Sequence, residues 1–426
     1  MKRCAPLLAV LLLGGSVPAR AARAPLPQDA GDSLRVSLLT MGPGREIFER
    51  FGHNAIRVQN LRTGMDSSYN WGVFDFAQPH FLMKFLTGDT EYSMEGYPTT
   101  PMVTWYRKDH RAVWEQDLAL SAAEKDSLWR FIQWNGREEN KYYRYDYYLD
   151  NCSTRVRDVI DRAMGGRLQP AATNHGHGVS FRSETLRLAA AFPVLNLGMD
   201  FALGPRADST LTAWQEMFIP MRMQDFLRGV RVPDADGRVG PLVTGERQLV
   251  VDSTYAERAQ APSLVWPALA AGIVLGLLIL SIATMSTTLP AARWGFLVLG
   301  GGWQALAGLV GPFVLVLGLF TKHMYMSQNL NLLLATPVSL ALAVIGPLAL
   351  WRGARLPAAR ALAVFTVVLA VAALLLRLVP ALSPDNGALL ALALPVHTSI
   401  AIALWRWEPL DRGAATAAAT AAAGTP

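Results

Sequence analysis

Five long runs of apolar residues occupy the part of the chain after residue 263. Each run approaches or exceeds the roughly 20 residues that a helix needs to cross a bilayer. Arg377 is the only Lys, Arg, Asp or Glu inside them, which makes buried helices of a soluble protein a poor alternative. We therefore predict an all-α bundle of five transmembrane helices over residues 264–405. The runs are Leu264 to Thr284, Trp294 to Phe320, Leu332 to Trp351, Ala361 to Leu382 and Ala388 to Trp405.

A different pattern fills residues 33–251, where short alternating segments precede helical ones. The segments LRVSLLTM, HNAIRVQN and SSYNWGVFDF are strand-like, and the turn LRTG separates the last two. Ser121 and Glu124 form a capping box that opens a helix through Trp134. A second helix, which stops at Gly165-Gly166, has an apolar face made of Val156, Val159, Ile160 and Ala163. We predict an α+β domain, an antiparallel sheet plus helices, joined to the first span by a linker over residues 252–263.

The two ends of the chain complete the predicted topology. Residues 1–21 combine a basic start, an apolar run and the small residues Ala19 and Ala21, which is typical of a secretory signal peptide. If the signal exports residues 33–251, the first span runs inward, and the arginines that follow the first, third and fifth spans fall on the cytoplasmic side. Those arginines are Arg293, Arg352, Arg355, Arg360, Arg406 and Arg412. We expect a multi-pass protein of the inner (cytoplasmic) membrane with a cytoplasmic tail over residues 406–426.

Composition and charge alter this picture little. Much of the formal net charge of +6 lies in the cytoplasmic arginines, so the charge does not require a nucleic-acid partner. The chain has two cysteines, and Cys4 lies in the predicted signal peptide. Cys152 would therefore be the single thiol of the mature protein, which makes an intramolecular disulfide impossible.

Cys152 lies in the segment YDYYLDNCSTRVRDVID, at a predicted helix start. Asp150 and Asn151 are good N-cap residues, so the thiol falls in the first turn, where the helix dipole favours the thiolate. Arg155 would strengthen this effect if it faces the sulfur. A buried structural cysteine is the alternative, but an exported compartment tends to oxidise or pair idle thiols. We predict that Cys152 is a nucleophile.

A cysteine nucleophile needs a histidine base within hydrogen-bond reach. His53 begins a predicted strand directly after Phe51-Gly52, although spacing alone does not exclude a structural histidine there. His175 and His177 form a loop without matching ligands, so we predict no metal and no cofactor. His323, in KHMYMSQNLNLLL, falls on the same side of the membrane as Cys152 by the predicted topology.

Several motifs, in order from about Ser33 to Pro337, resemble the Lnb type of bacterial lipoprotein N-acyltransferase. They are FGHNAIRV, YNWGVFDF, YDYYLDNCSTRVRDVID, LGMDFALGPRAD, MFIP and KHMYMSQNLNLLL. More distantly, a strand histidine that precedes an Asn-Cys helix start resembles the circularly permuted papain-like fold of lecithin retinol acyltransferase. This second resemblance implies a third polar group on the strand after the histidine, for which Asn70 is the first candidate and Asp75 the next.

The Lnb resemblance implies transfer of an acyl chain from a membrane phospholipid to the N-terminal amine of a diacylglyceryl-cysteine lipoprotein. His53 would activate Cys152, which would carry the chain as a thioester. The residues expected to support this pair are Asn70, Asn151, Tyr148, His323, Asn329 and Asn331. Tyr148 belongs to an aromatic cluster that either lines a lipid site or packs the core. The last three residues either close the site from the membrane side, bind headgroups or pack against the domain.

Two other functions are compatible with the same residues. One is a membrane-anchored cysteine peptidase or amidase of the cell envelope, with water as the acceptor. The other is a non-enzymatic envelope lipid-binding protein in which Cys152 is structural. Five spans exceed what a tether requires, which favours the acyltransferase, because its phospholipid donor and its lipoprotein acceptor both reside in the membrane.

Overall fold

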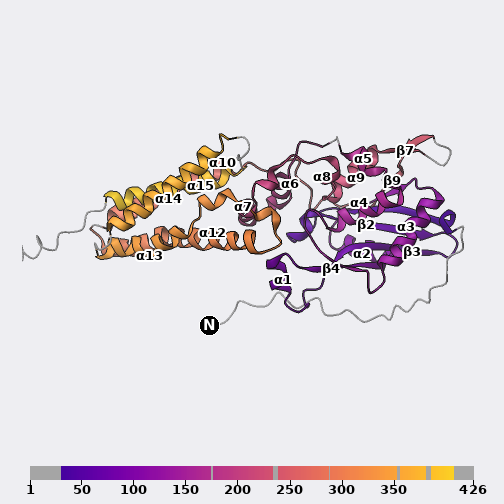
Figure 1. Ribbon diagram of the computed structural model, residues 1–426, viewed down its shortest axis with the longest axis horizontal. Helices are drawn as coiled ribbons and strands as arrows, with labels where there is room; N and C mark the ends of the chain where they lie inside the picture. The colour runs from indigo at the N-terminus through magenta and orange to yellow at the C-terminus, as the bar shows by residue number, and fades with distance from the viewer. Residues whose placement is uncertain are drawn as a thin grey trace, which may run out of the picture.

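The computed structural model describes residues 30–173, 176–233, 238–286, 288–352, 356–379 and 385–406. The predicted signal peptide at residues 1–21, His175 and the tail after residue 406 lie outside this part of the chain. Figure 1 shows two regions end to end, a domain of sheet and helices followed by a bundle of long helices. This division matches the predicted α+β domain followed by an all-α bundle.

The N-terminal domain is built on a seven-stranded sheet in which every neighbouring pair of strands is antiparallel. Its strand order is β6-β4-β3-β2-β1-β5-β9. The central hairpin of β2 and β3 places their paired segments side by side, from Ala55 opposite Asn70 to Asn60 opposite Met65. The strands are β1 Leu34–Met41, β2 His53–Asn60, β3 Met65–Val73, β4 Glu91–Pro98, β5 Val113–Leu118, β6 Tyr142–Arg144 and β9 Val243–Val250.

Helices cover both faces of this sheet because the central strands carry apolar side chains on both sides. On one face, Leu38 and Ile56 pack against α3 (Ala122–Asn135) and α4 (Cys152–Ala163). On the other face, Leu39 and Ala55 pack against α2 (Thr99–Lys108). The sheet is thus the middle layer of the domain, and α4 rests directly on it.

The two helices predicted over residues 121–166 are confirmed. Ser121 caps α3, and its capping box with Glu124 is complete. The predicted apolar face of α4 is buried at all four positions, Val156, Val159, Ile160 and Ala163. Gly165 and Gly166 follow the helix with φ of 67° and 79°, a left-handed conformation that glycine adopts without a steric penalty. This glycine pair therefore ends the helix, as the sequence indicated.

The remaining elements of the domain are short and lie between the sheet and the bundle or at the domain edge (Figure 1). Two of them, α1 and α7, lie next to the helical bundle. The helices are α1 Phe81–Thr87, α5 Leu168–Ala172, α6 Phe181–Leu188, α7 Pro193–Ala202, α8 Ala213–Glu216 and α9 Pro220–Gly229, and the edge hairpin is β7 Arg231–Pro233 with β8 Val239–Pro241.

Five helical spans in the described part of the C-terminal region are long and apolar enough to cross a membrane, as predicted. The fourth span begins earlier than expected, at Leu356, and the backbone carbonyls of Leu404 and Trp405 accept hydrogen bonds from the guanidinium of Arg360 near its start. The helices are α10 Val265–Met285, α11 Pro290–Phe296, α12 Gly302–Phe320, α13 Pro337–Arg352, α14 Leu356–Leu376 and α15 Gly387–Arg406. The second span, Pro290–Phe320, contains both α11 and α12.

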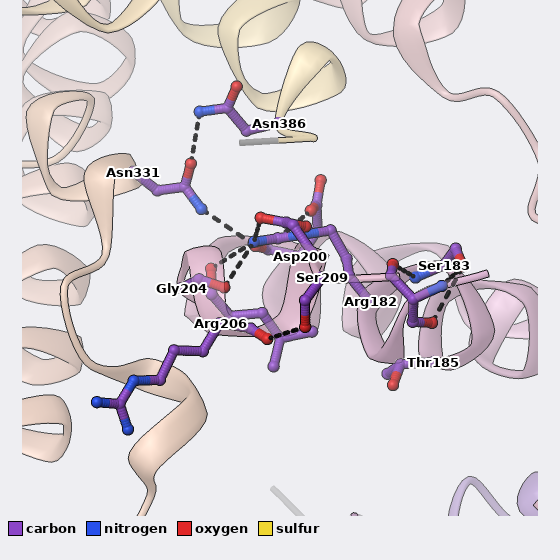
Figure 2. A network of polar contacts seen from close by, with 12 residues as sticks. Arg182, Ser183, Thr185, Asp200, Gly204, Arg206, Ser209, Asn331 and Asn386 are labelled. Atoms are coloured by element: carbon purple, nitrogen blue, oxygen red, sulfur yellow. Dashed lines mark hydrogen bonds and ion pairs between the residues drawn. The ribbon is translucent and has the colours of Figure 1, made fainter. Parts of the chain in front are cut away.

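A buried polar junction lies where the end of α7 meets the bundle (Figure 2). Arg182 is fully buried and pairs with the carboxylates of Asp200 (2.7 Å) and Asp208 (2.6 Å). It also donates to the backbone carbonyls of Asp200 (2.6 Å) and Leu203 (2.8 Å). Both carboxylates are thus held by one cation, with no part of that cation facing water.

The bundle contributes asparagines to the same junction. Asn331 donates to the carbonyls of Asp200 (3.1 Å) and Phe201 (3.1 Å) and accepts a hydrogen bond from Asn386 (2.7 Å). Asn329 donates to the carbonyls of Phe201 (2.7 Å) and Ala202 (2.9 Å). Side chains of the membrane region therefore satisfy the last carbonyls of α7, which lack partners inside the helix.

We expect Arg182→Met to destabilise the protein severely, because it leaves the carboxylates of Asp200 and Asp208 without their cation. Removal of one partner from a buried ion pair costs about 3–5 kcal/mol. The measurement is thermal unfolding of the detergent-solubilised protein.

Arg228→Met is the matched control. Arg228 also pairs with two carboxylates, Asp225 and Glu246, but its side chain is 49% exposed. Exposed ion pairs contribute about 0–1 kcal/mol, so this variant should unfold near the temperature of the unmodified protein. Equal losses in the two variants would contradict the role given to the buried junction.

Candidate active site

The first turn of α4 presents Cys152 on a backbone fixed by a capping box. The N-cap residue is Asn151, in an extended conformation (φ −111°, ψ −174°). Its side-chain oxygen accepts the N–H groups of Ser153 (2.9 Å) and Thr154 (3.0 Å), and the Thr154 hydroxyl oxygen accepts the N–H of Asn151 (2.8 Å). The Asn151 amide also donates to the carbonyl of Phe218 (2.9 Å). With these contacts, Asn151 positions the thiol.

The same turn is fastened to the strand that carries His53. Ser153 is fully buried, and its hydroxyl donates to the side-chain oxygen of Asn54 (2.8 Å). The backbone N–H of Asn54 faces the Cys152 sulfur. Asn54 directly follows His53, the first residue of β2. The thiol therefore lies beside the end of β2 that carries His53.

His53 is hydrogen-bonded to Asn70 on the neighbouring strand. The distance from His53 Nε2 to Asn70 Oδ1 is 3.0 Å. The amide nitrogen of Asn70 donates to the carbonyl of Ser68 (3.0 Å), so its oxygen faces the imidazole and accepts the Nε2–H. This assignment leaves Nδ1 as the proton acceptor of the ring. Asp75, the other candidate for the third group, instead accepts the N–H of Ala77 (2.8 Å) in the loop after β3.

A bulge in β3 brings the backbone of Gly72 against the thiol. The register with β4 shifts between Trp71 and Val73, and Gly72 has φ of 87°. A Cβ added to Gly72 would lie 3.4 Å from the Cβ of Cys152 and 3.9 Å from the Tyr143 hydroxyl oxygen. The backbone conformation therefore favours glycine here, while a Cβ would make only ordinary van der Waals contacts with the thiol residue.

Tyr143 brings a hydroxyl to the site. Its ring lies under the guanidinium of Arg155, 4.1 Å from the centroid. Its hydroxyl oxygen is buried against the backbone N–H of Gly72, and none of the described residues accepts a hydrogen bond from the hydroxyl. The sequence indicated an aromatic cluster at this place but could not distinguish Tyr143 from its neighbours. The structure does so by placing this uncommitted donor next to Gly72 and Cys152.

The cation that acts on the thiol and the imidazole is Arg111, which no sequence pattern pointed to. Arg111 is buried, donates to the carbonyl of Gly42 (3.2 Å) and pairs with Glu49 (3.3 Å). The positive charge of Arg111 favours the thiolate form of Cys152 and the neutral form of His53, so it acts to lower the pKa of each side chain. Arg155 was the cation expected from the sequence, but it pairs with Asp150 and covers Tyr143.

The electrostatics of the site differ from the thiolate expected at a helix start. Burial raises the pKa of the Cys152 thiol above its ordinary value, and this outweighs the nearby N–H groups and Arg111, which lower it. Burial also lowers the pKa of His53 to about 4, despite the hydrogen bond that the imidazole donates to Asn70. Both side chains keep a partly accessible surface. At neutral pH the resting pair is therefore a neutral thiol and a neutral imidazole.

The structure does not bring Tyr148 to the thiol. Its side chain is buried among Phe181, Phe218 and Tyr325, and its hydroxyl lies 2.7 Å from that of Thr185. Tyr148 therefore packs the core, one of the two roles expected for the aromatic cluster.

The three residues predicted near the membrane also lie away from the sulfur. His323 donates to the carbonyl of Phe85 (3.1 Å) in α1 and stacks on Tyr147 with ring centroids 6.0 Å apart. Asn329 and Asn331 hold the end of α7. Of the expected roles, packing against the domain describes their contacts.

We predict that alkylation of Cys152 by iodoacetamide rises with pH and inflects above pH 9.0, the ordinary thiol value, because burial disfavours the thiolate. The measurement is the labelling rate of the folded protein across pH, read by mass spectrometry. An inflection near neutral pH in the unmodified protein would show a preformed thiolate–imidazolium pair instead.

Asn70→Asp should move that inflection to lower pH by about one to three units, because a carboxylate beside His53 stabilises the imidazolium and through it the thiolate. The matched control is Asn60→Asp, a buried asparagine at the opposite end of β2 that accepts the N–H groups of Arg62 and Thr63. This control should leave the inflection in place.

Comparisons with known proteins fall on both regions of the chain. A model of the Lnb N-terminal periplasmic domain matches residues 22–188. A model of the Lnb transmembrane domain matches residues 260–406. Searches of curated proteins and of solved structures give no match, so the permuted papain-like relation stays a prediction. Since one match covers the central sheet with Cys152 and the other covers all five spans, the chain belongs to the Lnb family, as a multi-pass membrane protein with a periplasmic domain.

Proposed function

We propose that this protein is a lipoprotein N-acyltransferase of the inner membrane that carries the acyl chain on Cys152. The observation that supports this most directly is the thiol at the start of α4, beside a strand whose first residue, His53, is oriented by Asn70. This arrangement belongs to a periplasmic domain joined to five spans, where a phospholipid donor and a lipoprotein acceptor are both within reach.

In the first half of the proposed reaction, His53 takes the thiol proton on Nδ1 as the sulfur attacks the ester carbonyl carbon of a phospholipid. A neutral imidazole is required for this step, and the lowered pKa of His53 keeps it neutral at physiological pH. The tetrahedral intermediate then breaks its carbon–oxygen ester bond. The leaving alkoxide takes the proton from His53, which releases a lysophospholipid and leaves an acyl thioester on Cys152.

In the second half, the N-terminal amine of a diacylglyceryl-cysteine lipoprotein attacks the thioester carbonyl. His53 accepts the proton that the amine loses. Collapse of the intermediate breaks the carbon–sulfur bond, and the departing thiolate recovers the proton from His53. The products are an amide on the lipoprotein and the free thiol, so the protein returns to its starting state.

Both tetrahedral intermediates carry an oxyanion that needs hydrogen-bond donors. The N–H of Cys152 lies in the first turn of α4, where N–H groups have no acceptor within the helix. The hydroxyl of Tyr143, buried next to Gly72, is a second donor placed on the same side of the sulfur. We assign these two groups to the oxyanion.

The decisive test is mass spectrometry of lipoprotein N-termini from cells that lack their usual N-acyltransferase. Expression of this protein should convert free N-terminal amines to amides, and Cys152→Ala and His53→Ala should abolish the conversion. His110→Ala is the matched control, since His110 is exposed and pairs with Asp252. Free amines that persist despite normal expression would overturn the proposal, and a Cys152→Ala protein with full activity would point to a structural cysteine.

Tyr143→Phe should slow acyl transfer roughly 10²-fold, the loss typical of one oxyanion donor, while the ring keeps its place under Arg155. The rate of iodoacetamide labelling should not change, because alkylation forms no oxyanion. Tyr142→Phe removes the neighbouring hydroxyl, which donates to Glu138 on the surface, and should leave transfer intact. Equal transfer rates in the two variants would remove Tyr143 from the oxyanion site.

A further inference from the structure

The segment around α1 exposes a group of large apolar side chains. Phe76, Leu82, Met83 and Phe85 are 64%, 69%, 61% and 54% exposed. None of the seven residues of α1, all of which the structure describes, is buried. Because four large apolar side chains gathered on one short segment are unfavourable in water, this surface needs an apolar environment. We refer to residues 76–85 as the α1 surface.

The α1 surface adjoins the outer end of a membrane span. The N–H of Lys322, which follows α12, donates to the carbonyl of Thr87 (2.9 Å), and the Lys322 ammonium group pairs with Asp89 (2.6 Å). His323 donates to the carbonyl of Phe85 (3.1 Å). These contacts hold α1 against the end of α12, where the two helices lie close together (Figure 1).

The apolar exterior of the span continues onto the α1 surface. Leu319 and Phe320, the last residues of α12, are 64% and 79% exposed. Such residues on a transmembrane helix contact lipid. Exposed apolar side chains therefore extend from the end of the span onto α1.

Basic side chains border this surface, as expected beside phospholipid headgroups. The carboxylate of Asp89 interacts electrostatically with Lys322, Arg144 and Lys84. Arg144 also donates to the carbonyl of Gly88 (3.3 Å). Three cations therefore lie around one carboxylate at the edge of α1.

A row of aromatic rings leads from the α1 surface to the thiol. The ring centroids of Phe85 and Phe81 are 6.4 Å apart, and those of Phe81 and Phe74 are 6.0 Å apart. Phe74 stacks on Tyr92 at 5.0 Å, and Tyr92 stacks on Tyr145 at 4.2 Å. Tyr145 lies close enough to Cys152 to interact with it electrostatically. The rings connect an exposed apolar surface with the nucleophile.

We propose that the α1 surface inserts into the periplasmic leaflet of the membrane that the five helices span, and that the aromatic row guides a phospholipid acyl chain from this leaflet to Cys152. The proposed insertion is supported by the exposure of the apolar side chains on the α1 surface and by their continuity with the apolar exterior of the span. The proposed route for the acyl chain along the aromatic row rests on the proposed function. The lipid leaflet itself is what covers the α1 surface in this proposal. The test below distinguishes this from coverage by a partner protein.

The test uses the full chain with Cys4→Ser and Cys152→Ser, into which single cysteines are introduced and labelled with a fluorophore sensitive to water. Leu82→Cys reports on the α1 surface. Leu319→Cys is the lipid-facing reference, and Leu61→Cys, in the β2–β3 turn at the far end of the sheet from His53, is the aqueous reference. Leu61 and Leu82 have the same exposure, 69%, so the comparison isolates their surroundings.

Each labelled protein is placed in nanodiscs of phosphatidylethanolamine and phosphatidylglycerol with or without a lipid nitroxide near the glycerol end of the acyl chain. We expect roughly threefold stronger quenching at Leu82→Cys than at Leu61→Cys, because interfacial helices bury their apolar face at this depth. Quenching at Leu82→Cys equal to that at Leu61→Cys would overturn the insertion, and a label shielded from both water and lipid would indicate a protein partner.

A second arm tests the route to Cys152 in chains that keep their native thiol. Leu82→Glu should lower acyl transfer about tenfold, a change of about 1.4 kcal/mol in activation free energy, and should leave iodoacetamide labelling of Cys152 unchanged. Leu61→Glu is the matched control and should change neither quantity. Full transfer by Leu82→Glu would overturn the route. If the unmodified protein transfers no acyl chain, the proposed function fails, and the quenching pattern still decides whether α1 inserts.

Discussion

The hydrogen bonds of Asn151 are the constraint on which the site depends. A helix start has backbone N–H groups without internal acceptors, and Asn151 satisfies those of Ser153 and Thr154. Its own amide is tied to the carbonyl of Phe218, so the cap is anchored to a distant segment. The thiol of the next residue consequently has little freedom, and the N–H of Cys152 stays outside the capping box. The position of the thiol and the free N–H that we propose as an oxyanion donor arise from the same local geometry.

Burial then sets how this fixed thiol reacts. The helix start and Arg111 both favour a thiolate, yet removal of the sulfur from water has the larger effect and raises its pKa. Burial and Arg111 also keep His53 uncharged. A neutral pair suits a thiol in an exported domain, because a thiol is less prone to oxidation than a thiolate. In the proposed reaction, proton transfer accompanies the attack on the carbonyl instead of preceding it.

Local patterns in the sequence predicted much of this architecture. Capping residues, apolar periodicity and charge-free runs located α3, α4 and the five spans, because each signal lies within a few residues of its consequence. His53 and Asn70 were found through a family resemblance. Arg111 and Gly72 carried no local signal, and Tyr143 could not be distinguished from its aromatic neighbours, since the importance of all three arises from contacts between distant segments. The thiolate prediction was wrong for a related reason: the desolvation of Cys152 depends on the whole surrounding fold.

The buried junction at the end of α7 makes the structure of the periplasmic domain depend on the membrane region. Carbonyls at the end of a helix need partners, and those of Asp200, Phe201 and Ala202 find them in Asn329 and Asn331, more than a hundred residues later in the chain. During synthesis, the periplasmic domain therefore emerges with this helix end incomplete. Its final ordering must wait until the second and third spans are in place, which couples maturation of the soluble domain to successful membrane insertion.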